Sequence, residues 1–107
     1  MIDSWTRFHV LCALLQGPQY PYRIARDVAA ATGGRVVLEA GNLHRRLQQL
    51  LADGLIAEAR APETGADRRR RYYAITRQGR DALREETDRM HEAVRTARSA
   101  LAAGSRR

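Results

Sequence analysis

The sequence contains no lysine and only one cysteine, and these two shortages narrow what the protein can be. Its 19 basic side chains are all arginines, which outnumber 12 carboxylates and give a net charge of +7. A single cysteine, Cys12, cannot form an internal disulfide, and its apolar neighbours in the sequence agree with a reducing compartment. The excess of arginine favours a polyanionic partner, because each neutralised phosphate adds about one unit to the salt dependence of binding.

Long apolar runs are missing as well. No stretch approaches the ~18 apolar residues that span a bilayer, and the first residues do not resemble a secretion signal. We therefore expect no membrane partner and a cytoplasmic location. At 107 residues the chain has room for one small domain, which buries well under ~70% of its unfolded surface. A core of this size is marginal, so a second copy of the chain is expected to add stability.

A predicted helix over residues 42–55 carries the most informative pattern. One face holds four leucines, namely Leu43, Leu47, Leu50 and Leu51. The opposite face holds side chains that read base edges, namely Asn42, Arg45, Gln48 and Gln49. Arginine pairs with guanine through two hydrogen bonds, asparagine and glutamine pair likewise with adenine, and the major groove admits a helix. The pattern therefore predicts a DNA recognition helix, with His44 and Arg46 reaching bases or phosphates.

A basic hairpin is predicted directly after this helix. Its first strand covers residues 55–61, a polar turn follows, and the second strand returns through Tyr73, which we expect in the core; the position of Tyr72 stays open. Three arginines at the start of the second strand are predicted to contact DNA, namely Arg68, Arg69 and Arg70. A helix followed by a basic hairpin is the outline of a winged helix, although a wing that merely aids solubility has the same composition.

Two further helices are predicted before the recognition helix. The first begins at Asp3 or Ser4, either of which can cap it, and ends near Leu15 with apolar residues on two faces. The second begins near Pro21, because proline needs no amide partner in a first turn, and ends at the two glycines of 33–34. Residues 35–38 are expected to form a short strand or a linker, and residue 54 is a glycine suited to end the recognition helix.

A last helix is predicted over residues 77–103, with Thr76 as its N-cap. Its apolar residues follow a heptad spacing, namely Leu83, Thr87, Met90, Val94, Ala97 and Leu101. The other predicted elements are too few to cover a helix of this length. The alternative is that the seam packs on its own domain. We therefore predict a dimer interface made of this seam and the first helix, with Trp5, Phe8, Leu83, Met90, Val94, Ala97 and Leu101. The expected organisation is a mainly α winged helix-turn-helix domain (1–76), a dimerisation helix (77–103) and a disordered basic tail (104–107).

Three blocks of the sequence carry a family resemblance. They are LLQGPQYPYRIA at 14–25, LEAGNLHRRLQQLLADGLI at 38–56 and RRRYYAITRQGRDAL at 69–83. Over residues 11–83 the chain resembles the PadR family of bacterial transcriptional regulators, in particular its short members with one C-terminal helix. The resemblance implies a winged helix-turn-helix domain, dimerisation through the last and first helices, a palindromic operator in double-stranded DNA and, usually, repression. It implies neither an enzyme nor a cofactor.

The chain departs from the family pattern at three places. Pro21 stands where the family usually has glycine before the tyrosine of its second helix. Glu39 and Ala40 replace the common serine and proline before the recognition helix, and we expect Glu39 to cap that helix, because a carboxylate near DNA repels phosphate. His44 replaces a tyrosine, which would change the preferred operator sequence but not the docking mode.

Some family members bind flat aromatic or cationic compounds between their subunits. Trp5 and Phe8 could therefore line an effector site in this chain, although a plain aromatic dimer core fits them equally well. A second reading of the whole chain is a dimeric small-molecule sensor or protein-interaction module that has this fold without specific DNA binding.

Metal binding and catalysis are weaker alternatives. His9 lies one helical turn from Cys12, and Asp88 and His91 repeat that spacing, so a metal site across a dimer is conceivable. Such sites need three or four ligands, and each pair supplies two. A cysteine nucleophile would need a neighbouring base and an oxyanion site, for which an apolar helix is the wrong setting.

Overall fold

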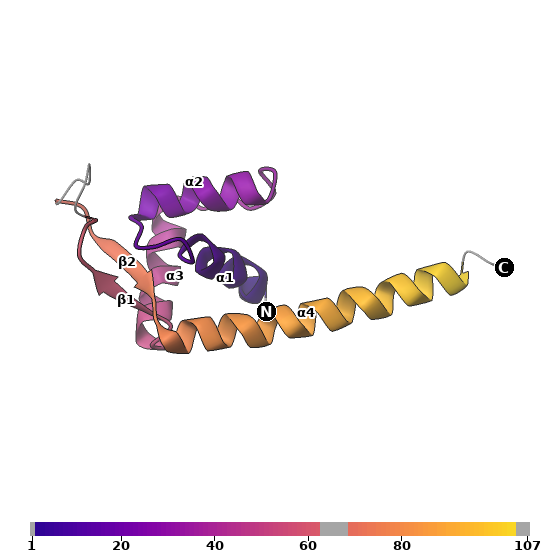
Figure 1. Cartoon of the computed structure of the whole chain (residues 1–107). Helices are drawn as coiled ribbons and strands as arrows, with labels where there is room; N and C mark the ends of the chain where they lie inside the picture. Colours follow the sequence, from indigo (N-terminus) through magenta and orange to yellow (C-terminus); the bar gives the residue numbers. More distant parts are fainter. Residues whose placement is uncertain (1, 63–68, 105–107) are drawn as a thin grey trace.

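The computed structural model describes residues 2–62 and 69–104, which form helices and one β-hairpin (Figure 1). In chain order the elements are α1 (Ile2–Ala13), α2 (Pro21–Ala31), α3 (Ala40–Ala52), β1 (Ile56–Ala59), β2 (Tyr72–Ile75) and α4 (Arg77–Gly104). The first three helices and the hairpin form a rounded body, from which α4 extends (Figure 1). The predicted fold class, mainly helical with a small hairpin, is confirmed. Gly104, predicted to begin the tail, is the last residue of α4, and 105–107 lie outside the described residues.

The first two helices differ from the prediction at their ends. Asp3 and Ser4, the predicted caps, lie inside α1, which also ends two residues before Leu15. Pro21 begins α2 as predicted, and Tyr20 occupies the N-cap position with an extended backbone. The hydroxyl of Thr32 at the end of α2 donates to the carbonyl of Val28 (2.9 Å) and accepts from the amide of residue 36 (3.0 Å). These bonds hold the described segment 35–39 as a linker and not as a strand.

Helix α3, the predicted recognition helix, lies close to its predicted bounds. Glu39 occupies its N-cap position, but within the described residues its side chain makes no capping hydrogen bond, so the predicted carboxylate cap is wrong. At the other end Gly54 has a φ of +76°, as a glycine after a helix can. The turn brings the amide of Leu55 to the carbonyl of Leu50 (3.0 Å), and β1 follows at once.

The start of α4 is packed tightly against the turn that follows α3. The hydroxyl of Thr76 donates to the carbonyl of Gly54 (2.7 Å) and accepts from the amide of Gly79 (2.9 Å), so Thr76 caps α4 as predicted. A Cβ atom on Gly79 would lie 2.0 Å from the carbonyl oxygen of Leu55, a distance that no side chain can occupy. The direction of α4 is therefore fixed relative to the end of the recognition helix.

The hairpin is short and is joined to the turn before α2. Ile56 pairs with Ile75 and Ala59 with Tyr72 in antiparallel register, and β1 is shorter than the predicted strand over 55–61. Backbone hydrogen bonds between Gln19 and Tyr73, 2.8 and 3.0 Å long, add a bridge on the other side of β2. Most of the predicted turn (62–67) and the predicted wing contact Arg68 fall at 63–68, outside the described residues.

One apolar core holds the body together. It draws on every helix and both strands, and its buried members are Val10, Leu11, Leu14, Ile24, Val28, Leu38, Leu43, Leu47, Leu50, Leu55, Ile56, Tyr73 and Leu83. Tyr73 lies in this core as predicted, and Tyr72 is buried beside it. Leu83, in contrast, was predicted in the dimer seam but is only 6% exposed in the core of its own domain. The first two turns of α4 pack on the body, which turns Leu83 inward.

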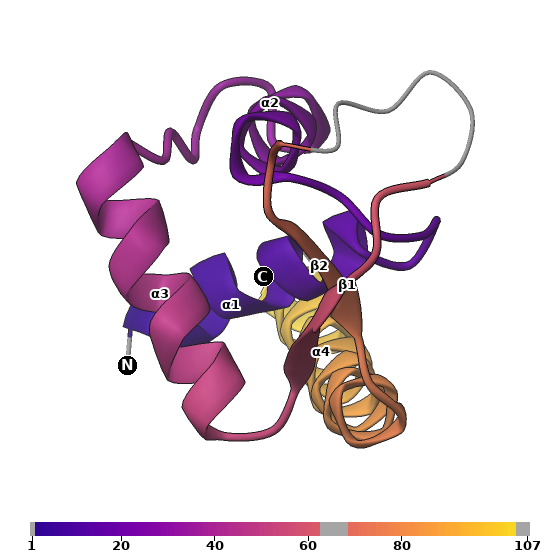
Figure 2. The same cartoon turned by 90° about the vertical axis from the view of Figure 1, so that its left-hand side faces the viewer.

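Beyond Leu83 the apolar side chains of α4 face solvent, except that of Met90, which is half-buried. Val94 is 50% and Leu101 71% exposed, and α4 projects past the body at this point (Figure 1). Seen from the side that lies at the left of Figure 1, α3 and the hairpin lie at the front and the far part of α4 lies behind them (Figure 2). None of the described helices is both long and apolar enough to cross a membrane.

Candidate nucleic-acid interface

The outward face of α3 carries the predicted base-reading side chains. His44, Arg45, Gln48 and Gln49 are exposed, because the leucines of the opposite face anchor α3 in the core. Asn42 and Arg46 are half-buried. The side-chain oxygen of Asn42 accepts hydrogen bonds from Arg45 Nη2 (3.3 Å) and Arg46 Nε (3.1 Å). In the free protein Asn42 therefore orients two arginines, and it would have to exchange these bonds to pair with adenine.

The base of the wing adds three exposed arginines to this side of the molecule. Arg69 and Arg70 are among the predicted wing contacts, whereas Arg71 is not. Arg71 forms an ion pair with Glu58 of β1 (3.6 Å), in which both side chains are more than half exposed, so it adds little to stability. Arg70 lies over the ring of Tyr20, with its guanidinium carbon 4.1 Å from the ring centre.

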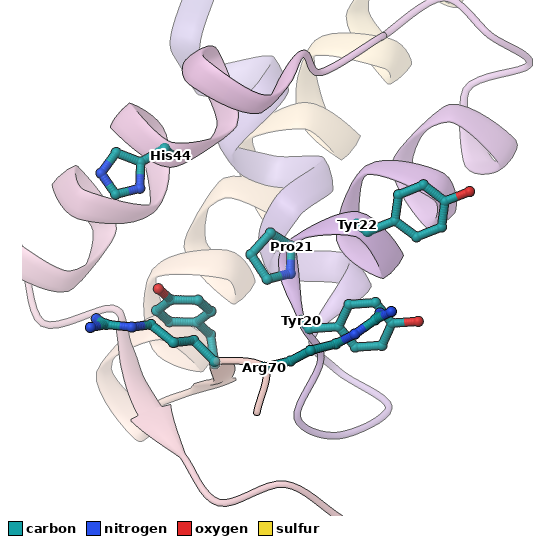
Figure 3. A pocket seen from close by; sticks show the side chains of 7 residues that line it. Tyr20, Pro21, Tyr22, His44 and Arg70 are labelled. Carbon is teal, nitrogen blue, oxygen red and sulfur yellow. The ribbon is translucent and has the colours of Figure 1, made fainter. Parts of the chain in front are cut away.

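A hollow of about 780 Å³ lies between α3 and the wing, and we call it the wing hollow. Figure 3 shows it with Arg70 beside Tyr20, and with His44 on the facing helix. It is lined by Tyr20, Pro21, Tyr22, His44, Arg70, Arg71 and Tyr73. A smaller apolar cavity of about 350 Å³ adjoins it between α2 and α3. The wing hollow thus combines guanidinium, phenol and imidazole groups on the same side as the outward face of α3.

Sequence reasoning missed Tyr20, Tyr22 and Arg71 as candidate contacts. The signal that could have found them is the segment QYPY at 19–22, which places two aromatic side chains around the first residue of α2. Tyr22 is 65% exposed, which is a high fraction for a large aromatic side chain. The partners of Tyr20 are Arg70 at the base of the wing and Tyr72 at the start of β2, about fifty positions later, so local periodicity does not reveal the contact.

The predicted dimer surface is largely exposed. Trp5 is 49% exposed and its ring stacks on Phe8, with centroids 5.9 Å apart and planes 5° from parallel. On α4 the predicted seam, apart from Leu83, continues as a row that we call the distal seam, namely Met90, Val94, Ala97 and Leu101. Met90 is half-buried and the other three are exposed. Ion pairs one turn apart, such as Arg95 with Glu92 (3.3 Å), flank this row and keep α4 polar elsewhere.

The residues of the metal and nucleophile alternatives sit in unsuitable surroundings. Burial raises the pKa of the Cys12 thiol, which keeps it protonated and disfavours both thiolate attack and metal ligation. Burial also lowers the pKa of His9, whose Nε2 is buried without a hydrogen-bond partner among the described residues. Across residues 2–62 and 69–104 no three histidine, cysteine, aspartate or glutamate side chains gather as a metal site would require.

Solved structures of similar shape agree with this architecture. A PadR-like transcriptional regulator from Bacillus cereus is 20% identical, with a TM-score of 0.79 over 94% of this chain and 95% of its own. A PadR family transcriptional regulator from Eggerthella lenta is 26% identical, with a TM-score of 0.71 over 92% of this chain and 83% of its own. Bacillus subtilis PadR in complex with operator DNA is 20% identical, with a TM-score of 0.62 over 76% of this chain and 45% of its own.

A family profile gives the assignment. No curated protein matches the chain. The profile described as the transcriptional regulator PadR-like family, however, matches residues 10–85, which is well over half of the chain. Its members are DNA-binding regulators and not enzymes. The resemblance seen in the sequence is confirmed, and the chain belongs to the PadR-like family of transcriptional regulators.

Proposed function

We propose that the protein is a transcriptional repressor that binds a palindromic operator as a homodimer. The observation that carries this proposal is the exposed face of α3, where arginine and amide side chains stand beside a basic wing. Arg45 and Gln49 read base edges, Asn42 joins them once its bonds to the two arginines are exchanged, and His44, Arg46 and Gln48 reach bases or phosphates. The arginines 68, 69 and 70 of the wing hold phosphates or enter the minor groove.

Dimerisation is the second part of the proposal. The distal seam and the aromatic pair Trp5 and Phe8 form the interface, because both leave apolar surface exposed in one chain. A twofold axis through that interface places the two α3 helices in successive major grooves, roughly 34 Å apart. The operator complex of Bacillus subtilis PadR supports DNA binding by this fold. Repression follows if the bound dimer covers a promoter, and a repressor of bacterial genes acts in the cytoplasm.

An effector would release the dimer from DNA. A flat aromatic or cationic compound could stack on Trp5 and Phe8 between the subunits and change the spacing of the two α3 helices. It can shift that equilibrium only by its difference in affinity for the DNA-binding and the released conformer. The alternative function, a sensor or interaction module without specific DNA binding, keeps the dimer and this site but not the operator.

The test is selection of bound sites from random duplex DNA, followed by competition binding. We expect an enriched palindrome with half-site centres about one helical turn apart. The enriched site should be bound about 10³-fold or more tightly than random duplex at physiological salt. If no sequence is enriched and all duplexes compete equally, the repressor proposal fails and the interaction-module alternative is favoured.

A further inference from the structure

The wing hollow contains a guanidinium group that is held in place by stacking. Arg70 lies over the face of Tyr20 at 4.1 Å, a cation–π contact. Tyr20 in turn meets the edge of Tyr72, with ring centroids 5.6 Å apart and planes at 77°. Tyr72 is only 5% exposed, so the stack rests on a side chain anchored in the body. The position of the Arg70 charge therefore depends on the turn before α2 as well as on β2.

The backbone under Tyr20 is fixed from both sides. The neighbouring Gln19 exchanges two backbone hydrogen bonds with Tyr73 of β2, at 2.8 and 3.0 Å. Pro21 begins α2 directly after Tyr20, and its ring restricts the backbone there. The turn before α2 and the base of the wing thus form one unit, in which a change at either side moves the stacked pair.

The place of the wing hollow suggests what it binds. We take α3 to lie in a major groove and the wing to reach the adjacent minor groove. The sugar–phosphate strand that separates these two grooves then passes over the surface between α3 and the wing. The wing hollow lies in this surface, with His44 on one side and Arg70 on the other (Figure 3). The N–H groups of a guanidinium lie in the plane of the group itself, where their geometry matches phosphate oxygens.

We propose that the wing hollow binds one backbone phosphate in each half-site, with Arg70 as its contact and Tyr20 as the residue that positions Arg70. Tyr22 stands at the rim with an exposed phenol and donates a hydrogen bond to the same phosphate or the next one. This inference rests on the proposed docking of α3 in the major groove. The proposed phosphate site contacts no base, and it sets the depth at which α3 enters the major groove.

The experiment replaces each phosphate of the selected operator in turn by a neutral methylphosphonate. With the unaltered protein we expect one phosphate per half-site, between the bases read by α3 and the minor groove under the wing, to lose about tenfold in affinity. The variant Arg70→Gln should bind all DNA more weakly, with a salt slope lower by about one unit per half-site. It should also be indifferent to the methylphosphonate at that one phosphate and respond normally at the others.

Two further variants separate positioning from contact. Tyr20→Phe keeps the ring and should bind like the parent, whereas Tyr20→Leu removes the stack and should weaken binding several-fold. Tyr20→Leu should also lose most of the sensitivity at the Arg70 phosphate, which a merely structural defect would leave intact. Arg84→Gln on α4 is the matched control for the loss of one exposed arginine, and it should change neither the phosphate profile nor the preference for the operator.

The outcomes distinguish this inference from the proposed function. The wing hollow is not a phosphate site if Arg70→Gln loses affinity at the same methylphosphonate positions as the parent protein. The same conclusion follows if Tyr20→Leu binds the operator as tightly as Tyr20→Phe. If the parent protein shows no preferred sequence, the proposed function has failed instead. Arg70 is exposed, so Arg70→Gln is expected to fold and carries the test even where thermal melting shows that Tyr20→Leu is unstable.

Discussion

The two ends of α4 differ sharply in burial, although they belong to one continuous helix. Leu83 near its start is 6% exposed in the core, whereas Leu101 near its end is 71% exposed. The same heptad spacing runs through both residues. The first turns of α4 therefore belong to the core of one chain, whereas the rest leaves its apolar side chains exposed, as the proposed dimer interface requires. A periodic pattern can thus continue past the point where the core ends.

The largest expected losses of stability lie where α4 joins the body, at Gly79 and at Leu83. In Gly79→Ala the new Cβ would lie 2.0 Å from the carbonyl oxygen of Leu55, so α4 must move away from the turn after α3. We expect the free energy of unfolding to fall by about 3 kcal/mol. Urea denaturation measures it.

Gly41→Ala is the control, because its Cβ would meet open space within helix α3. Alanine has the better helix propensity, so this variant should unfold at equal or higher urea concentration than the parent. A similar loss of stability in both variants would contradict the tight junction between α4 and the body.

Truncation at the two ends of α4 tests the comparison directly. Leu83→Ala should lower the free energy of unfolding by about 2–5 kcal/mol at every protein concentration, because it leaves a cavity in the core. Leu101→Ala should leave the fold of the single chain intact and weaken self-association instead. Urea denaturation at two protein concentrations, together with sedimentation, separates the two effects. An equal, concentration-independent loss in both variants would mean that the far end of α4 packs on its own domain.

The wing is expected to contribute affinity without selectivity. Arg69→Ala removes one exposed charge at the base of the wing and should weaken binding to operator and random duplex by the same factor. The slope of log K against log salt should fall by about one unit per subunit. Fluorescence anisotropy titrations at several salt concentrations measure both quantities. A loss confined to the operator would show instead that Arg69 reads a base.

The smallest expected effect is a pH dependence of stability that arises in α1. Burial among Trp5, Phe8 and Cys12 lowers the pKa of His9 below its ordinary value of 6.5, so the unfolded chain binds the proton more readily. The contribution of the neutral His9 side chain to the free energy of unfolding is therefore complete above pH 6.5, and it is lost progressively as the pH falls below that value. Arg35, Arg23 and Asp27 line the two cavities beside His9, and Arg23 is paired with Asp27 (3.4 Å), so burial is the cause of the lowered pKa.

Thermal melting between pH 7.5 and about 5 checks this sign. The variant His9→Gln should flatten the fall of melting temperature at low pH. His91→Gln, at an exposed position of α4, should leave that fall unchanged. If His9→Gln falls as steeply as the parent protein, other groups carry the acid sensitivity.

Local patterns predicted much of this fold. The leucine spacing gave α3, Pro21 gave the start of α2, and Thr76 gave the cap of α4, because each of these signals acts within a few residues. Glu39 was a wrong prediction of the same kind, since a residue at an N-cap position can keep its carboxylate away from the helix. The prediction that Leu83 belongs to the dimer seam was also wrong. A periodic pattern does not show at which residue a helix stops packing on its own domain.

The parts of the candidate site that the sequence did not predict depend on contacts between distant segments. The bridge from Gln19 to Tyr73 and the stack of Arg70 on Tyr20 join positions about fifty residues apart. A single sequence shows which residues are aromatic or basic but not which of them meet. The hydrogen bonds of Asn42 with Arg45 and Arg46 are local in sequence. The sequence nevertheless does not show which of several possible side-chain partners Asn42 has in the folded helix.

The claim that α3 reads the operator is tested most directly by Arg45→Ala. Its affinity should be measured by titration against the selected operator and against duplexes in which each base pair is changed in turn. We predict a loss of about 1–3 kcal/mol on the operator and indifference to one base pair per half-site that the parent protein discriminates. Affinity equal to that of the parent, with every base preference intact, would contradict the account.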